Sequence, residues 1–148
     1  MIRLEEIAYG TAAYAATVEL RNDVMRRPLG RDIHTEDLSQ EKDAVIIGAY
    51  DGARLIGTGV MLPMGDVCSL EFLCVEPSLQ LGGIGGRILA ALEDKAVARG
   101  ASRMTMHARV SAKGFYERQG YADTGEECVH RGAPVPHLIM EKHLGRAE

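Results

Sequence analysis

The chain has 148 residues, of which 46% are hydrophobic, and this predicts a single domain over residues 1–148 built on one core of ordinary size. Acidic residues outnumber Lys and Arg by 21 to 17 and the basic residues are scattered, so a nucleic-acid partner is not expected. No apolar run reaches the ~18 residues of a membrane span and the first residues do not resemble a signal peptide, so we expect a cytoplasmic protein with no membrane partner.

The first part of the chain predicts one strand and two helices. Residues 2–7 alternate apolar and charged side chains, which is typical of a strand with one exposed face. After Thr11, apolar residues recur at helical spacing until the stretch ends near Gly30, which predicts a helix of about fourteen residues. Thr35 precedes two acidic residues, a pattern typical of a helix start, so a short second helix is expected from Thr35 to about Lys42.

The middle of the chain predicts three consecutive strands. Its apolar runs are rich in residues that favour strands, and Asp51-Gly52 between the first two is a turn dipeptide. The expected strands cover residues 44–50, 54–62 and 67–75.

The remaining third alternates helices and strands. An apolar stripe at helical spacing over residues 84–96 is followed by Gly100, where a helix-terminating glycine belongs. Ser111 and Gly120 bracket another expected helix. The expected strands are residues 103–107, 121–128 and 138–143.

The three cysteines have no spacing typical of a disulfide framework or a zinc site. Cys68, Cys74 and Cys128 lie in apolar runs, so we expect reduced, buried thiols. No other cluster has the spacing of metal ligands, and no metal is expected.

A glycine-rich segment, Gln80 to Gly86, lies between an expected strand and the strongest expected helix. The first amides of a helix lack helical partners, so a glycine-rich helix entry can bind a pyrophosphate. The alternative is a flexible turn. A Walker A loop is excluded because no Lys followed by Ser or Thr ends the segment, and a dinucleotide fingerprint is disfavoured because Ile88 stands where its third glycine belongs.

Two motifs resemble the GCN5-related N-acetyltransferases. Gln80, Gly83 and Gly85 match the family signature Q/R-x-x-G-x-G/A, and residues 112–121 look like its A-x-x-F-Y-x-x-x-G-F/Y element. The resemblance covers nearly the whole chain and implies an α/β fold with a mixed, mostly antiparallel sheet flanked by helices, the acyl-CoA N-acyltransferase fold. Arg109 departs from the family, since many members have Asn there.

The resemblance also implies acetyl-coenzyme A as the acyl donor. Backbone groups of Leu73, Cys74 and Val75 would pair with its pantetheine arm where the central strands splay apart. The amides of the glycine-rich segment would hold its pyrophosphate. The cofactor-binding residues expected on this basis are Leu73, Cys74, Val75, Gln80, Leu81, Gly82, Gly83, Ile84, Gly85, Gly86, Ala112 and Phe115.

Four residues are candidates for chemistry or for binding the acceptor. Strand alternation puts Glu71 on the face of Leu73, which makes Glu71 the first candidate for the general base; alternatively it faces solvent. His107 and His137 are alternative bases or acceptor-binding residues, or else structural histidines. Tyr116 matches the family tyrosine that returns a proton to the leaving thiolate; alternatively it only packs beneath a helix.

These observations predict an N-acetyltransferase that moves an acetyl group to a primary amine of a small molecule or peptide in a ternary complex. A non-catalytic acyl-CoA sensor, a hydroxyl acceptor and a longer acyl group stay open. The acceptor pocket is expected from residues 21–35 and 126–137, the least regular stretches. Glu126 and Glu127 would attract a cationic amine or form a solvated pair. A homodimer is compatible with the family.

Overall fold

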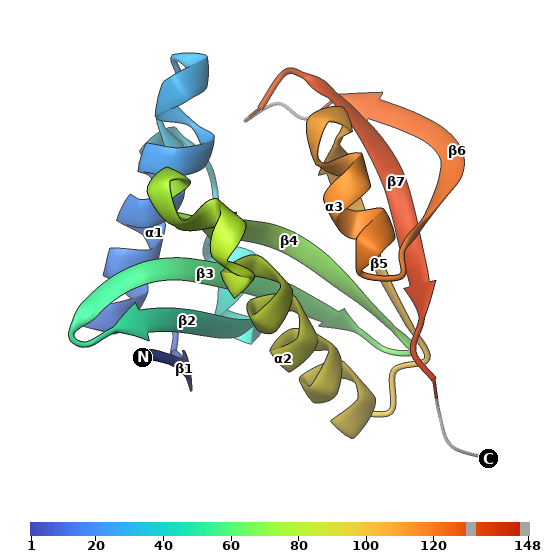
Figure 1. The fold of residues 1–148 in the computed structure, drawn as a ribbon, viewed down its shortest axis with the longest axis horizontal. Helices are drawn as coiled ribbons and strands as arrows, with labels where there is room; N and C mark the ends of the chain where they lie inside the picture. The colour runs from blue at the N-terminus through green and yellow to red at the C-terminus, as the bar shows by residue number, and fades with distance from the viewer. Residues whose placement is uncertain (130–132, 146–148) are drawn as a thin grey trace.

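The computed structural model describes residues 1–129 and 133–145, which form a seven-stranded sheet with helices on its faces (Figure 1). The strand order is β1-β2-β3-β4-β5-β7-β6, and all neighbours are antiparallel except the parallel pair β4 and β5. The expected mixed, mostly antiparallel sheet is therefore confirmed. The strands are β1 (Ile2–Glu6), β2 (Val45–Asp51), β3 (Arg54–Met64), β4 (Val67–Val75), β5 (Arg103–Arg109), β6 (Ala122–Val129) and β7 (Pro136–His143). The α-helices are α1 (Ala12–Met25), α2 (Ile84–Ala98) and α3 (Lys113–Arg118).

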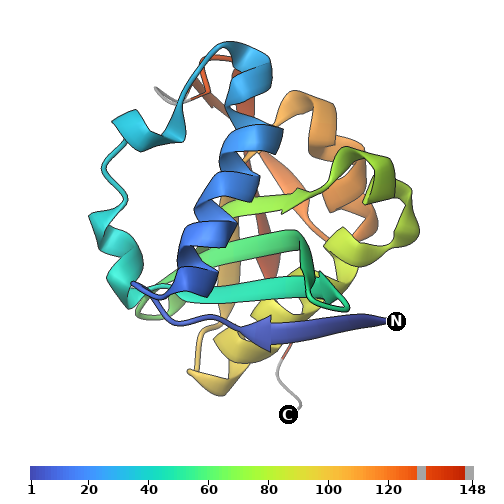
Figure 2. The same ribbon diagram turned by 90° about the vertical axis from the view of Figure 1, so that its left-hand side faces the viewer.

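The helices α1 and α2 cover opposite faces of the sheet, as Figure 2 shows with α1 in front of the strands and α2 behind them. The larger core cluster lies beneath α2 and includes Ile88 and Leu92, both fully buried. A smaller cluster beneath α1 contains Ile46 and Val60. The apolar stripe expected for α2 is thus buried against the sheet, which is what stabilises an amphipathic helix.

Helix α1 begins at the residue expected from the sequence and buries an unusually polar face. The side chain of Thr11 accepts a hydrogen bond from the Tyr14 amide, which is the usual N-cap arrangement. Arg21 is fully buried and forms two hydrogen bonds with Glu41, at 2.8 and 2.9 Å. Asn22 is also buried, and its side-chain oxygen accepts from the Ile33 amide. The polar face of α1 therefore holds the segment that follows it.

The second helix expected from Thr35 to Lys42 is wrong. The chain between α1 and β2 instead forms three short 3₁₀ turns, η1 (Arg27–Leu29), η2 (Ile33–Thr35) and η3 (Ser39–Asp43). Asp32 accepts from the His34 amide and Asp37 accepts from the Ser39 amide. Such local side-chain bonds compete with helical ones, and the ties to α1 hold the segment in its irregular path.

The other expected elements are present within a few residues of their predicted ends. Gly100 follows α2 with φ of +85°, the left-handed conformation expected of a terminating glycine. The helix expected from Ser111 is divided into a 3₁₀ turn, η5 (Val110–Ala112), and the short α3. In the part of the chain that the structure describes, no helix is long and apolar enough to cross a membrane.

Candidate active site

The sheet opens between its two central strands. β4 and β5 pair only from Val67 with Arg103 to Leu70 with Met106. Beyond these pairs, β4 continues with β3 as its neighbour and β5 continues with β7. The parallel ladder therefore stops while both strands go on, so beyond Leu70 the edge of β4 that faces β5 has no strand paired with it.

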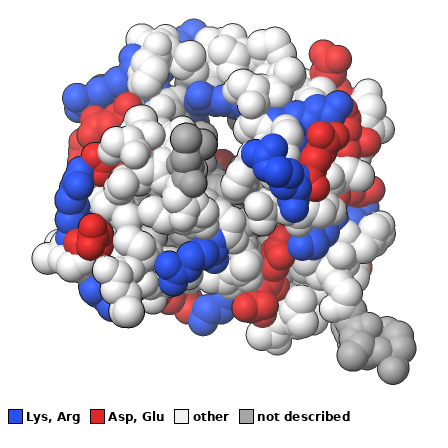
Figure 3. Space-filling view, viewed as in Figure 1, with Lys and Arg blue, Asp and Glu red and all other residues white. Residues whose placement is uncertain are grey.

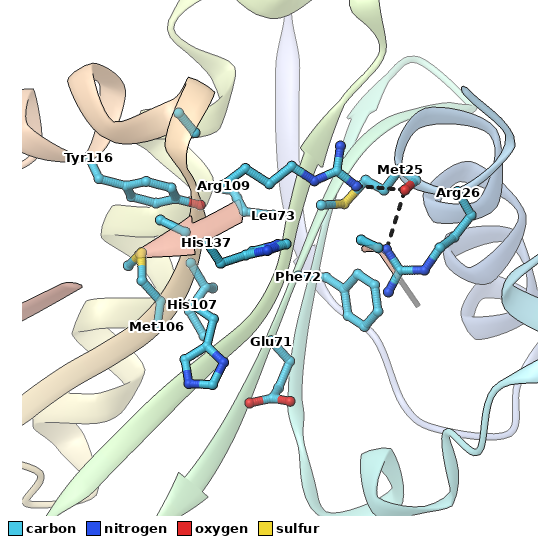
Figure 4. Close-up of a pocket in the computed structure, with 14 residues that line it drawn as sticks. Met25, Arg26, Glu71, Phe72, Leu73, Met106, His107, Arg109, Tyr116 and His137 are labelled. Carbon is cyan, nitrogen blue, oxygen red and sulfur yellow. Dashed lines mark hydrogen bonds between the residues drawn. The ribbon is translucent and has the colours of Figure 1, made fainter. Parts of the chain in front are cut away.

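A cavity of about 100 Å³ lies at this opening (Figure 4). Its walls come from the end of α1, from β4 and β5, from α3 and from the start of β7. The residues lining it are Met25, Arg26, Leu70, Glu71, Phe72, Leu73, Met106, His107, Ala108, Arg109, Ala112, Tyr116, Ala133 and His137. Both stretches expected to form an acceptor pocket contribute to this wall, although residues 130–132 of the second stretch lie outside the described structure.

Glu71 reaches the cavity, but not for the reason inferred from strand alternation. β3 and β4 change register here: Val60 pairs with Phe72 and Met61 with Leu70, so Glu71 has no partner in β3. Such a bulge interrupts the alternation of faces, and the expected shared face with Leu73 is wrong. The Glu71 carboxylate is exposed and accepts a 2.5 Å hydrogen bond from the Ser69 hydroxyl.

The two candidate histidines lie in different surroundings. His107 is exposed and follows the last parallel pair of β5. His137 is 4% exposed, and its Nδ1 lies 2.7 Å from the Val135 carbonyl oxygen. Burial lowers the pKa of His137, and the nearby charges of Arg109 and His107 lower it further. His137 is therefore neutral near pH 7, with Nδ1 as the donor to Val135.

Tyr116 is buried in α3, and its hydroxyl points into the cavity (Figure 4). Burial raises the pKa of this phenol, and the neighbouring Cys74 thiol adds to the effect. The raised pKa keeps Tyr116 protonated at neutral pH, as a proton donor must be. Cys74 itself is buried, and burial raises its pKa to about 12, so it is an inert thiol instead of a nucleophile. Cys68 is buried as well, whereas Cys128 is only partly buried; all three are reduced, as expected.

The glycine-rich junction suits a phosphate group at the start of α2. It follows a 3₁₀ turn, η4 (Pro77–Gly82), and Gly83 has φ of +77°, which favours glycine. The amide of Arg87 donates to the Gly83 carbonyl at the start of the helix. The amides of Ile84, Gly85 and Gly86 precede it and form the positive end of the helix.

Two of the glycines also lie close to Phe115 and Gln119, a proximity that the sequence did not indicate. A Cβ atom on Gly85 would lie 3.4 Å from the Phe115 ring, and one on Gly86 would lie 3.3 Å from the Gln119 side chain. The first distance is an ordinary van der Waals contact and the second meets the end of a flexible side chain, so packing does not require glycine at either position. Phe115 therefore packs against the helix start.

The remaining expected cofactor residues are placed around the same junction. The side chain of Gln80 donates a 3.0 Å hydrogen bond to the Val75 carbonyl, which ties the loop to the end of β4. Ala112 lines the cavity just before α3. Backbone of Leu81 and Gly82 lies in η4, next to Gly83. No group of His, Cys, Asp and Glu suitable for a metal ion occurs among the residues whose positions are described.

Two arginines of the cavity were missed by sequence reasoning. Arg26 and Arg109 both donate to the Met25 carbonyl, at 3.3 and 2.6 Å (Figure 4). Arg109 is the direct cross-strand partner of His137. The departure of Arg109 from the family pattern was the one signal in the sequence that pointed to this feature. Nothing in the sequence indicated that Arg26 would donate to the same carbonyl as Arg109.

Comparison with known proteins agrees with this architecture. Residues 18–144 match the family model described as an acetyltransferase (GNAT) domain. The chain is 34% identical over 107 residues to YjcF of Bacillus subtilis strain 168, named an uncharacterized N-acetyltransferase, with 72% of this chain and 74% of YjcF covered. It is 29% identical over 110 residues to YyaT of the same organism, covering 74% of this chain and 72% of YyaT.

Solved structures show the same fold. A Lactobacillus plantarum protein assigned as an N-acetyltransferase superposes with a TM-score of 0.83 at 26% identity, covering 97% of this chain and 99% of that one. An aminoglycoside 6'-N-acetyltransferase in complex with coenzyme A gives 0.78 at 18% identity and 99% coverage of both chains, a likeness of fold alone. The family model spans most of the sequence, so the resemblance is confirmed and the protein belongs to the GNAT acetyltransferase family.

Proposed function

We propose that the protein transfers the acetyl group of acetyl-coenzyme A directly to a primary amine of a small molecule or peptide, with both substrates bound at once. The observation that carries this proposal is the opening between β4 and β5. Its β4 wall runs from Leu73, which lines the cavity, to Val75, whose side chain lies beside Gly85 at the start of α2. One extended donor could thus span the helix start and the cavity.

The residues around the opening suit the two ends of the donor. The amides of residues 81–86 would hold the pyrophosphate, because they lie at or just before the positive end of α2. The backbone of Leu73, Cys74 and Val75 would bond the pantetheine arm as an added strand. A backbone amide in the same stretch would stabilise the oxyanion formed at the thioester carbonyl.

Transfer forms a bond between the amine nitrogen and the carbonyl carbon and breaks the bond from that carbon to sulfur. A lysine-like amine has a pKa of about 10.4, so it must lose a proton before it attacks. We assign the removal of this proton to Glu71, whose exposed carboxylate can accept it and pass it on to solvent. Tyr116 gives its proton to the departing sulfur, and solvent restores it.

The histidines have a binding role in this proposal. His137 is buried and neutral, and its contact with Val135 fixes the ring against the cavity wall. His107 lies on β5 beside the cavity and is exposed. Both would contact the acceptor instead of taking its proton, which leaves Glu71 as the base.

The test is thiol release from acetyl-coenzyme A by the purified protein in the presence of a panel of primary amines. We expect thiol release with at least one amine and a matching gain of one acetyl group in that amine by mass spectrometry. Saturable binding of acetyl-coenzyme A without thiol release for any amine would instead indicate an acyl-CoA sensor and refute the proposed activity.

A further inference from the structure

The cavity holds two cations that share one carbonyl. The guanidinium groups of Arg26 and Arg109 both donate to the Met25 carbonyl oxygen at the end of α1. A helix C-terminus carries partial negative charge, which attracts cations. One carbonyl nevertheless offsets only part of two positive charges.

The two arginines differ in how their charges are balanced. Arg26 forms hydrogen bonds with Glu36 at 2.6 and 3.2 Å, so its charge is neutralised. Arg109 forms no ion pair with any carboxylate in residues 1–129 and 133–145, and its buried Nε atom has no hydrogen-bond partner there. Burial and the charge of Arg26 both lower the pKa of Arg109. Within these described residues, Arg109 is therefore a cation that lacks an anionic partner.

The other charged groups around the cavity do not supply that partner. Glu71 is bonded to Ser69 and lies away from Arg109 in Figure 4. Glu126 and Glu127 are exposed on β6 and do not line the cavity. Arg109 does not belong to a broad basic surface on the face that Figure 3 views, since Lys and Arg are interspersed there with Asp and Glu.

We infer that the acceptor is a small amine that carries a carboxylate, such as an amino acid, and that Arg109 binds this carboxylate. The inference rests on the proposed function and names its substrate class. A guanidinium matches a carboxylate with parallel hydrogen bonds, which are stronger than neutral ones. A small acceptor of this class suits the cavity, which has a volume of about 100 Å³.

The competing role for Arg109 is purely structural. Its bond to Met25 ties the end of β5 to the end of α1, and such a tie would need no ligand. A structural tie would affect all acceptors equally. Carboxylate recognition would affect only acceptors that carry a carboxylate, so paired acceptors separate the two roles.

The experiment measures kcat/KM for L-amino acids, each paired with its own carboxamide, in wild type, Arg109→Gln, Arg109→Lys and Arg27→Gln. Arg27 is an exposed arginine beside the cavity segment that pairs with Asp23, so its variant is the matched control. Wild type and Arg27→Gln should prefer the carboxylate form by about tenfold or more. Arg109→Gln should abolish this preference, and Arg109→Lys should retain part of it. Equal rates for both forms in wild type, or a preference that survives Arg109→Gln, would overturn the inference.

A second experiment measures binding alone and so tests this inference independently of the proposed activity. N-acetylglycine and N-acetylglycinamide are titrated by calorimetry into wild type saturated with coenzyme A. We expect N-acetylglycine to bind about tenfold more tightly, and equal affinities would overturn the inference without any variant having to fold. Failure of every amine to release thiol refutes only the proposed activity, because the titration still decides carboxylate binding.

Discussion

The two ends of the candidate site are built in different ways. The donor end is local: Gly83, Gly85 and Gly86 lie together in the chain, and Phe115 packs against them from one further motif. The cavity end gathers side chains from α1, β4, β5, α3 and β7, which are far apart in the sequence. A site built from neighbouring residues can be recognised as a motif in the sequence. A site built from residues far apart in the chain can be identified only in the folded structure. The acceptor end is also where members of one fold can differ in substrate.

The largest expected effect concerns the buried ion pair between Arg21 of α1 and Glu41 of η3. Glu41→Gln leaves the fully buried Arg21 without its counter-ion, which should lower the free energy of unfolding by about 3 kcal/mol. Chemical denaturation measures it. The control is Asp23→Asn, which removes an exposed pair with Arg27 and should cost less than about 1 kcal/mol. Equal losses in the two variants would show that the buried pair does not anchor α1.

Tyr116→Phe tests the proposed proton donor, which lies between the donor end and the acceptor end of the candidate site. The variant keeps the packing of the ring and removes the proton donor, so kcat should fall about 100-fold while the Kd for acetyl-coenzyme A stays unchanged. Steady-state kinetics and calorimetry measure the two quantities. Tyr121→Phe is the control, because the Tyr121 hydroxyl bonds Glu93 and does not line the cavity. Unchanged turnover in Tyr116→Phe would remove Tyr116 from the mechanism.

Gly83→Ala tests the donor end. A side chain is strained at φ of +77°, so stability should fall by about 1 kcal/mol. Acetyl-coenzyme A affinity should fall by up to about tenfold, because relief of that strain would move the first amides of α2. Gly65→Ala is closely matched, with φ of +74° in an exposed turn. It should lose similar stability and keep its affinity; a parallel loss of affinity would argue against a phosphate site at Gly83.

The smallest expected effect is a pH dependence from His137. Its pKa is lowered in the folded state, whereas the unfolded chain binds this proton near pH 6.5. As pH falls through this range the unfolded state gains the proton first, so stability should decrease. His137→Gln should reduce this slope by at most one proton, as measured by denaturation at several pH values. An unchanged slope would indicate that His137 titrates as it does in the unfolded chain.

The sequence predicted most of the fold because its elements are delimited by glycine and turn residues. The Asp51-Gly52 turn separates β2 from β3, and Gly100 ends α2, as expected. Irregular features were not predicted, because long-range contacts determine them. The 3₁₀ turns after α1 depend on buried partners such as Glu41, and the bulge at Glu71 depends on the register between β3 and β4.

The candidate site was predicted only in its local part. The motif around Tyr116 gave its position, and the structure places Tyr116 at the cavity together with Glu71, His107 and His137. The convergence of Arg26 and Arg109 on the Met25 carbonyl was not predictable. It requires the end of α1 to lie against the end of β5, and no motif or spacing in the sequence indicates that contact.

Binding of acetyl-coenzyme A tests the central claim most directly, because every assigned role assumes that the opened sheet and the start of α2 hold this donor. Isothermal titration of the purified protein should give saturable heat, accompanied by an upward shift of Tm. Titration without heat and without a change in Tm would contradict the account, including the roles of Tyr116 and Glu71.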